Sequence, residues 1–469
     1  YYYFLSKTIK VVSNYISSST YGKCSSSSSS SSSLNQQNEN KNEEIIPIEI
    51  NEPIKVIKPT SSLNSNSNSS PSPPLPPPIH IVFSTDCGTF QDWQTLVFFY
   101  SARIIKQPGK VTRIASGCSE EKQTMLTELY NKLFPEFNVH FTPDYSKDER
   151  TNQKYHFYNK PFGVLHWIEH SIPPIEPGTI VAICDPDFIF LRPLTGKITN
   201  EPNTVVSLWK KEDINFDYVK QGHPVAQQYG LGAPWVNDNH LKFNRTFICG
   251  KGSPCTRVPD QHTGGKAYSV GPPYIVELTD LHRLTKTWCQ FVPRVFVKYP
   301  YLLAEMYGYS MAAAHEELPH LTLDHFMVSD IDAYGEGWQW IDNLGDNVCQ
   351  LPDSNGIYYP NQPLPTFIHY CQAYRIDTIG YGKRRIPHDI FSCSSPMLLE
   401  PNPEISHSNS FIKDNKEIQK LGPRQVKRNA FVICTASRVI NSALEYYKSV
   451  MCDSTKETIN YEKTLNIFK

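Results

Sequence analysis

Between residues 80 and 184, short apolar runs alternate with segments of helical periodicity. The runs "HIVFST", "KVTRIAS", "FNVHF" and "TIVAIC" have the length and the β-branched content of buried strands. The intervening segments place apolar residues at helical spacing after Trp93, after the N-cap candidate Ser119 and after Pro161. Strands that alternate with helices indicate an α/β domain with a mainly parallel sheet.

The two ends of the chain have a different composition. Residues 1–77 hold a poly-Ser run, an Asn/Glu/Lys patch and the stretch "SSLNSNSNSSPSPPLPPP". Such a segment buries too little apolar surface to offset its ordering entropy, so we expect a disordered stem or linker. Low-complexity drift without a function is the alternative. We expect residues 78–400 to form the main folded domain, and residues 401–469 to form a polar linker and a C-terminal helix.

The region from about residue 211 to 266 appears as a loop-rich insertion. The chain starts with Tyr, so we expect a fragment of a longer protein, and an anchor upstream of it stays open. No apolar stretch reaches the roughly 18 residues that a spanning helix needs.

Cysteine usage and charge bear on compartment and partners. None of the 12 cysteines forms a C-x-x-C pair, so zinc-finger spacing is absent. Cys249 and Cys255 flank a short loop that a disulfide could close, which would imply an oxidising compartment. Asn68 and Asn244 each begin a glycosylation sequon. The net charge of −1 gives no basic field, so nucleic acid is not an expected partner.

Asp185 and Asp187 stand one residue apart, directly after the apolar run "TIVAIC". In a parallel sheet, ligands bind beyond the carboxyl ends of the strands. Pro186 favours extended backbone at Asp185, which would point both carboxylates to the same side. Paired hard oxygen ligands suit Mg²⁺ or Mn²⁺. A chance D-x-D in a surface turn is the alternative, but the preceding buried strand favours the metal.

A divalent ion held by two carboxylates usually takes further ligands from a substrate's phosphates. The chemistry indicated is the loss of a phosphate-containing leaving group. The sequence has neither a P-loop nor the kinase motifs, so a sugar nucleotide fits better. Two other classes stay open: a glycoside hydrolase that uses paired carboxylates, and a non-catalytic sugar-binding protein.

Several blocks between residues 80 and 400 resemble, in the same order, the hydroxyproline O-arabinosyltransferase and peptidyl serine α-galactosyltransferase group. They include "VFSTDCGTFQDWQTLVFFYSARIIKQPGKVTRIASGC", "NKPFGVLHWIEH", "CDPDFIFLRPL", "LTDLHRLTKTW", "AEMYGYSMAAAH" and "FIHYCQAYRI". The resemblance implies a GT-A-type, Rossmann-like fold with helices on both faces of the sheet. It also implies a UDP-sugar donor, Mn²⁺ or Mg²⁺, and O-glycosylation of hydroxyproline or serine in secreted proteins, with retention of anomeric configuration.

The resemblance implies a location as well. The expected compartment is the Golgi or another part of the secretory pathway. The protein would be a single-pass type II membrane protein with a lumenal catalytic domain.

The same resemblance assigns roles to individual residues. It implies that Asp185 and Asp187 meet the metal and the donor's ribose or diphosphate. It adds His369, in "TFIHY", as a further metal ligand, whereas a lone His after an apolar run is otherwise a packed core residue. It implies that the residues at the end of the first strand contact the donor's uridine. The alternative role of these residues is to cap the following helix. These donor candidates are Ser84, Thr85 and Asp86.

Charged residues complete the set of candidates. Arg113 and Lys160 could balance the diphosphate of the donor. Lys383 lies in a loop that could close over the departing phosphate, so it is both a donor-binding and a catalytic candidate. Glu305 sits among apolar neighbours and could orient the acceptor hydroxyl or stabilise charge on the sugar ring. Pairing with a buried Arg is the structural alternative for Glu305.

The sequence around Asp185 and Asp187 does not identify the donor sugar. Arabinosyltransferases of the group tend towards an "EPDHIF"-like sequence and the galactosyltransferases towards a "DADMIM"-like one, whereas this chain has "DPDFIF". Arabinofuranose and galactose both stay open. The segment around residues 235–260 has no evident counterpart in the group, so the acceptor stays open too.

Overall fold

The structure is a computed structural model. It describes residues 78–148, 152–198, 217–237, 243–345, 348–350, 364–407, 411–414 and 417–468. The stem expected over residues 1–77 lies outside the described residues. So do parts of the expected insertion at 211–266 and of the polar linker expected after residue 400.

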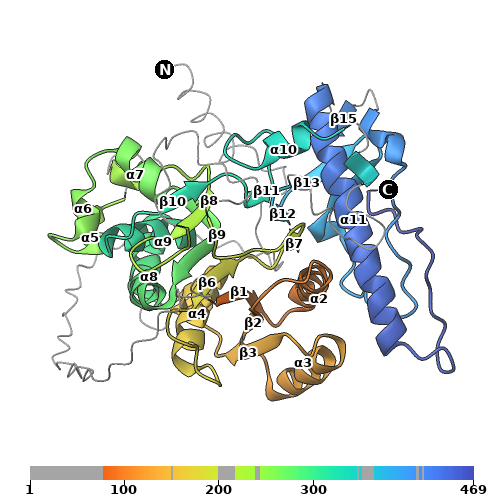
Figure 1. The fold of residues 1–469 in the computed structure, drawn as a ribbon, viewed down its shortest axis with the longest axis horizontal. Coiled ribbons are helices and arrows are strands. Elements are labelled where there is room, and N and C mark those ends of the chain that lie inside the picture. Colours follow the sequence, from red (N-terminus) through yellow and green to blue (C-terminus); the bar gives the residue numbers. More distant parts are fainter. Residues whose placement is uncertain are drawn as a thin grey trace, which may run out of the picture. The chain divides into compact units, whose positions relative to one another are not determined.

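A seven-stranded sheet forms the centre of the domain (Figure 1). Its strands run in the order β10-β8-β9-β6-β1-β2-β3 and are parallel except for β9, which is antiparallel to both of its neighbours. The predicted class, an α/β domain with a mostly parallel sheet, is confirmed. The strands are β1 (Ile79–Asp86), β2 (Lys110–Ser116), β3 (Asn138–Thr142), β6 (Ile180–Cys184), β8 (Val225–Gln228), β9 (Val270–Glu277) and β10 (Leu321–Leu323).

Helices cover both faces of this sheet, as predicted. Alternate residues of β1 point to opposite faces: Ile81 and Phe83 enter one hydrophobic core and Val82 enters the other. The first core is closed by α2 (Thr89–Ile104), α3 (Glu120–Leu133) and α11 (Pro423–Met451). The second is closed by α4 (Asn159–His170), α8 (Leu278–Lys298) and α9 (Ala304–His315).

Strand register brings several chain segments to one edge of the sheet. Phe83 of β1 lies opposite Cys184 of β6, and Asp86 lies opposite Ser116 of β2. The residues that follow β6 therefore lie beside the last residues of β1. This edge is the one where the sequence places its candidate residues.

A smaller sheet extends this edge. Its strands β11 (Met327–Val328), β12 (Phe367–His369) and β7 (Phe188–Phe190) run in that order, and β12 pairs antiparallel with β7. The hairpin β13 (Ala373–Ile376) and β14 (Ile379–Gly382) follows directly after β12. Two further two-stranded pairs are β4 (Lys147–Asp148) with β5 (Gln153–Lys154), and β15 (Phe411–Asp414) with β16 (Glu417–Lys420).

Strand β9 is missing from the sequence-based prediction. Its sequence "VGPPYIVE" contains Pro272 and Pro273, and proline is rare inside central strands because it cannot donate a ladder hydrogen bond. The structure accommodates both prolines at an irregularity: Gly271 pairs with Gln227, Tyr274 pairs with Ala226, and the register shifts between them.

The region expected as a loop-rich insertion contributes to the core of the domain. It supplies strand β8 of the central sheet and three short helices. These helices are α5 (Arg245–Cys249), α6 (Pro254–Arg257) and α7 (Gln261–Tyr268); the remaining short helix, α10 (Trp338–Asp342), lies outside this region.

The C-terminal helix α11 packs against the domain rather than extending away from it (Figure 1). Ala430, Phe431 and Val432 of this helix are fully buried in the core that also holds α2. Disulfides Cys349–Cys434 and Cys393–Cys452 tie it to earlier segments. Residues on the two sides of the expected boundary at position 400 thus share one core.

Two further disulfides lie elsewhere in the domain. Cys249–Cys255 closes the short loop identified in the sequence, so that pairing is confirmed. Cys87–Cys118 links the segment after β1 to the segment before α3. Across the part of the chain that the structure describes, no helix combines the length and the apolar character required to cross a bilayer.

Candidate active site

Asp185 and Asp187 lie in the short connection between β6 and β7. The chain turns at Pro186 and Asp187, so the carboxylates approach each other through a turn rather than along the extended strand that we expected. The Asp187 carbonyl accepts a hydrogen bond from the Tyr370 amide at 3.1 Å. Because Phe188 also pairs with His369 across the β7–β12 ladder, the end of β12 is held directly beside the carboxylate pair.

The three predicted metal ligands therefore come together. His369 Nε2 lies 3.4 Å from Asp187 Oδ1 and 3.8 Å from Asp185 Oδ2. The ligand atoms of all three residues lie within 4.8 Å of one another, and Asp187 and His369 are buried. Two carboxylates and an imidazole converging on one point form a donor set that fits a divalent ion such as Mn²⁺.

A lysine neutralises each carboxylate. Lys160, in the first turn of α4, places Nζ 2.7 Å from Asp185 Oδ1. Lys383, immediately after β14, places Nζ 2.5 Å from Asp187 Oδ2. Both side chains are mostly buried, so these ion pairs are shielded from water and salt. The site thus brings together two acidic and two basic groups.

These charges set the protonation of the site. Burial alone would raise the pKa of the Asp187 carboxyl, but the charges and hydrogen bonds of Lys383 and His369 hold that pKa well below its usual range. Burial disfavours the charged Lys160, yet Asp185 and Glu305 raise the pKa of its ammonium above the ordinary value. Asp187 is therefore ionised, and Lys160 protonated, at neutral pH.

Glu305 lies in the first turn of α9 and is as buried as Asp187. Its exposure is 3%, and its Oε1 atom lies 3.6 Å from Lys160 Nζ, an ion-pair distance but not a hydrogen bond. Burial raises the pKa of the Glu305 carboxyl to about 7; Lys160 counteracts this rise and Asp185 adds to it. The partner of Glu305 is thus not the buried Arg that the sequence suggested but a lysine that also contacts Asp185.

The main chain of Glu305 is fixed on both sides. Trp288 Nε1 donates to the Glu305 carbonyl at 3.0 Å, and the Glu305 amide donates to the Tyr155 hydroxyl at 3.1 Å. These contacts hold the start of α9 against α8 and the segment before α4.

The donor candidates at the end of β1 lie at the same edge of the sheet. The Ser84 hydroxyl donates to the Asn159 carbonyl at 3.3 Å, which joins β1 to the start of α4. Asp86 Oδ1 accepts from the Gly88 amide at 2.8 Å, just before α2 begins. Asp86 therefore stabilises the entry to α2, and the donor-binding role of Ser84, Thr85 and Asp86 stays a prediction.

Arg113 is fully buried and its guanidinium is used within the protein. It donates to the Thr85 hydroxyl at 2.8 Å, to the Asp86 carbonyl at 3.0 Å and to the Tyr130 hydroxyl at 2.7 Å. It also pairs with Asp92 at 2.9 Å. Arg113 thus holds the end of β1 in place through Thr85 and Asp86. Because its guanidinium is engaged within the protein, this arrangement does not favour the direct diphosphate contact expected from the sequence.

Three buried tyrosine hydroxyls near the site escaped the sequence analysis. Tyr274, Tyr370 and Tyr381 have fully buried rings, and none of their hydroxyls has a hydrogen-bond partner among the described residues. Burial raises the pKa of each phenol, and nearby carboxylates raise it further: Glu305 and Asp185 for Tyr274, and Asp187 for Tyr370 and Tyr381. In the sequence they are indistinguishable from core aromatics. An unpaired buried hydroxyl is costly, so these groups are available to a bound ligand or water.

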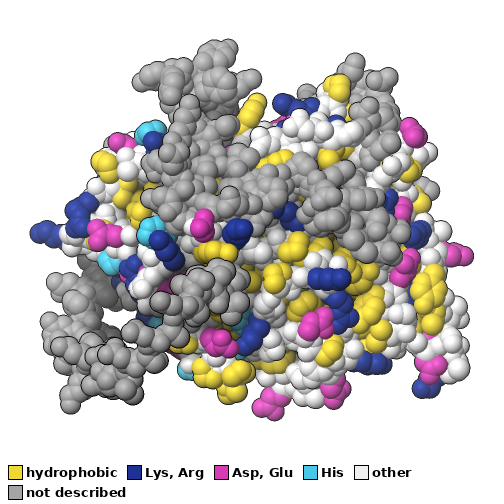
Figure 2. All heavy atoms as spheres, in the orientation of Figure 1, with side chains coloured by type: hydrophobic (Ala, Val, Ile, Leu, Met, Phe, Trp, Pro, Cys, Tyr) yellow, Lys and Arg dark blue, Asp and Glu magenta, His cyan; other side chains and the backbone are white. Residues whose placement is uncertain are grey.

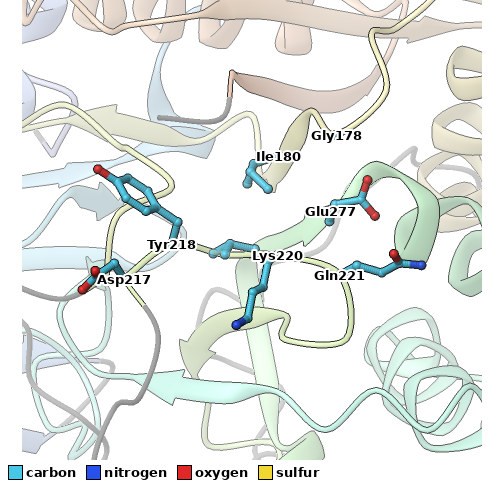
Figure 3. A pocket seen from close by; sticks show the side chains of 8 residues that line it. Gly178, Ile180, Asp217, Tyr218, Lys220, Gln221 and Glu277 are labelled. Atoms are coloured by element: carbon cyan, nitrogen blue, oxygen red, sulfur yellow. The ribbon is translucent and has the colours of Figure 1, made fainter. Parts of the chain in front are cut away.

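An open pocket of about 490 Å³ lies at the other end of the sheet (Figure 3). It is lined by Ile180, the first residue of β6, and by Glu277, the last residue of β9. The carboxylates follow the opposite end of β6, so this pocket is separate from them. Figure 2 shows acidic and basic side chains interspersed among the coloured residues of the face in view, with no continuous basic patch.

Known proteins similar to this chain are glycosyltransferases. Residues 79–222 match the model of the hydroxyproline O-arabinosyltransferase family N-terminal domain. A peptidyl serine alpha-galactosyltransferase of Arabidopsis thaliana is 27% identical over 322 residues, which cover 62% of this chain and 34% of that protein. One of Chlamydomonas reinhardtii is 34% identical over 116 residues, covering 24% of this chain and 14% of that protein.

The resemblance inferred from the sequence blocks is therefore confirmed. The aligned part of the chain spans about a third or less of the length of these relatives.

Solved glycosyltransferase structures are also similar. The galactosyltransferase LgtC with donor and acceptor sugar analogues shows 12% identity and a TM-score of 0.33, covering 66% of this chain and 98% of that one. The bifunctional glycosyltransferase WbbM shows 10% identity and a TM-score of 0.31, covering 65% of this chain and 47% of that one.

Proposed function

We propose that this chain is a metal-dependent glycosyltransferase. It would move arabinofuranose or galactose from a UDP-sugar to a hydroxyproline or serine hydroxyl of a secreted protein. The anomeric configuration of the sugar would be retained. The observation that carries the proposal is the convergence of Asp185, Asp187 and His369 at the carboxyl edge of the sheet, flanked by Lys160 and Lys383. Similarity to peptidyl serine galactosyltransferases and to the arabinosyltransferase family model supports the choice of sugars and acceptors.

The metal candidates are Asp185, Asp187 and His369, and Mn²⁺ or Mg²⁺ bound there would neutralise charge on the departing diphosphate. The two lysines have the complementary task. Each already bears a positive charge beside a carboxylate. When a donor enters, each ammonium can therefore exchange the carboxylate for a phosphate oxygen as its ion-pair partner. Lys383 directly follows the β13–β14 hairpin, and its long, flexible side chain would move from Asp187 to the phosphate.

The acceptor hydroxyl would attack the anomeric carbon from the face that UDP leaves, and its proton would pass to the departing phosphate oxygen. This step needs no strong protein base. Glu305 suits it poorly as a direct base, since its carboxylate lies buried beyond Lys160. We assign Glu305 the role of positioning Lys160.

We also propose that the protein works in the Golgi or elsewhere in the secretory pathway. The four disulfides among the described residues support an oxidising compartment. A lumenal catalytic domain on a type II anchor, joined by the stem over residues 1–77, completes this proposal.

The test is a screen of UDP-sugars against the full chain with and without Mn²⁺. We expect Mn²⁺-dependent release of UDP with one of UDP-arabinofuranose and UDP-galactose, and transfer of that sugar to a hydroxyproline- or serine-containing peptide. Metal-independent cleavage of a glycoside without any affinity for UDP would indicate a hydrolase instead. UDP-sugar binding with no turnover towards any acceptor or water would indicate a non-catalytic protein.

A further inference from the structure

Asn244 lies on the surface directly before the short helix α5. Its side-chain Oδ1 accepts a hydrogen bond from the Phe247 amide at 2.9 Å and so caps the N-terminus of α5. No described residue engages the Nδ2 atom of the same group. Asn244 and Thr246 are both exposed, and Arg245 stands between them. The asparagine and the hydroxyl of an N-x-T sequon are thus presented together.

We infer that Asn244 carries an N-linked glycan. In the step required, Nδ2 forms a bond to the anomeric carbon of the first sugar of a lipid-linked oligosaccharide. The bond from that carbon to the lipid diphosphate breaks, the diphosphate leaves with its electron pair, and the amide loses one proton to a base. The product keeps Oδ1 as an acceptor, so the contact with Phe247 survives modification.

Phe247 supplies an independent observation for this site. Its side chain is 41% exposed, which is unusual for a large aromatic residue on a folded domain. It lies three residues after Asn244, close to the spacing that brings side chains to the same side of a helical turn. The Lys298 ammonium lies 4.8 Å from the ring centroid. A sugar attached at Asn244 can pack its C–H face against the ring and cover apolar surface that is otherwise open to water.

The nearby disulfide fits the same compartment. Cys249, the last residue of α5, is joined to Cys255, so the segment that bears the sequon is stabilised under oxidising conditions. The inference rests on the secretory location proposed above and not on the transferase reaction. A failure of the glycan therefore leaves the proposed activity standing, and the reverse also holds.

The test is to express the full chain with a cleavable secretion signal in eukaryotic cells and to map its glycopeptides by mass spectrometry. We expect the peptide containing Asn244 to carry a glycan, and release by peptide N-glycosidase to convert that Asn to Asp. Asn244→Gln and Thr246→Ala should each lose this glycan. Thr246→Ser, which keeps a hydroxyl, should retain it. Asn68→Gln removes the other sequon and is the control: it should leave modification at Asn244 unchanged.

An unmodified Asn244 peptide from the secreted wild-type protein would overturn the inference. The packing on Phe247 has its own readout. Removal of the glycan from the folded wild-type protein should lower Tm, and the same treatment of Phe247→Ser should change Tm less. Equal shifts in both proteins would show that the glycan does not pack on the ring.

Discussion

The Lys383 ammonium lies 2.5 Å from Asp187 Oδ2, while His369 Nε2 lies 3.4 Å from the other oxygen of the same carboxylate, Oδ1. Since both side chains are largely buried, a metal ion must compete with an ammonium that already neutralises Asp187. Metal and diphosphate should therefore bind together: the ion takes the carboxylate while Lys383 moves to a phosphate.

Lys383→Met tests this competition. We expect Mn²⁺ alone to bind about tenfold more tightly and UDP in the presence of Mn²⁺ to bind about tenfold more weakly, the scale of one 1.4 kcal/mol interaction. Isothermal titration measures both affinities. Lys132→Met, in an exposed last turn of α3, is the matched control and should change neither. Unchanged Mn²⁺ affinity in Lys383→Met would show that the ammonium does not compete.

Arg113 should matter mainly for stability. Its substitution by Met removes a fully buried guanidinium and its contacts with Thr85, Asp92 and Tyr130, and we expect a loss of about 3 kcal/mol in the free energy of unfolding. Lys122→Met removes the other partner of Asp92, a partly exposed one, and should cost no more than about 1 kcal/mol. Urea denaturation compares the two. Equal losses would contradict the buried role of Arg113.

Glu305 should give the protein a distinct pH dependence. Its pKa in the folded state is raised to about 7 from an ordinary 4.5, so the folded state holds its proton more tightly than the unfolded state does. The contribution of Glu305 to stability therefore falls as pH rises from about 4.5 to about 7. Glu305→Gln lacks this titration.

The stability of Glu305→Gln relative to wild type should accordingly increase across this interval by up to about 3 kcal/mol, the equivalent of a shift of roughly 2.5 pH units. Comparing the two proteins cancels the histidines that titrate in the same range, such as His80, whose pKa burial lowers to about 4. Denaturation curves at pH 4.5 and pH 7 without added metal measure the effect. A pH-independent difference between the proteins would exclude a buried, titrating Glu305.

Local sequence signals were sufficient for much of the fold. The run "KVTRIAS" became β2 with the expected bounds, and Ser119 caps α3 by accepting from the Lys122 amide. The helix and strand periods in these segments agree with their tertiary contacts, so local preference and packing favour the same structure. Strand β9 was missed because Pro272 and Pro273 violate the local rule, and only the irregular pairing with β8 makes them tolerable.

The site was predictable in its residue types but not in its pairings. The carboxylate pair was identified from Asp185 and Asp187 standing directly after a buried strand, and His369 from its place in a late strand. Which lysine meets which carboxylate depends on how α4 and the β13–β14 hairpin dock at the sheet edge. The sequence likewise shows Glu305 as an acid among apolar residues, but it does not show that Lys160 contacts both Glu305 and Asp185.

The central claim is that Asp185, Asp187 and His369 hold a divalent ion that binds a diphosphate. The most direct measurement is Mn²⁺ binding in the presence of UDP, followed by electron paramagnetic resonance, for wild type and Asp187→Asn. Asp377→Asn, at an exposed position with φ of 53° that Asn adopts equally well, is the control. We predict one bound Mn²⁺ in wild type and in the control, and affinity weakened more than about 100-fold in Asp187→Asn. Wild-type affinity in Asp187→Asn would contradict the account.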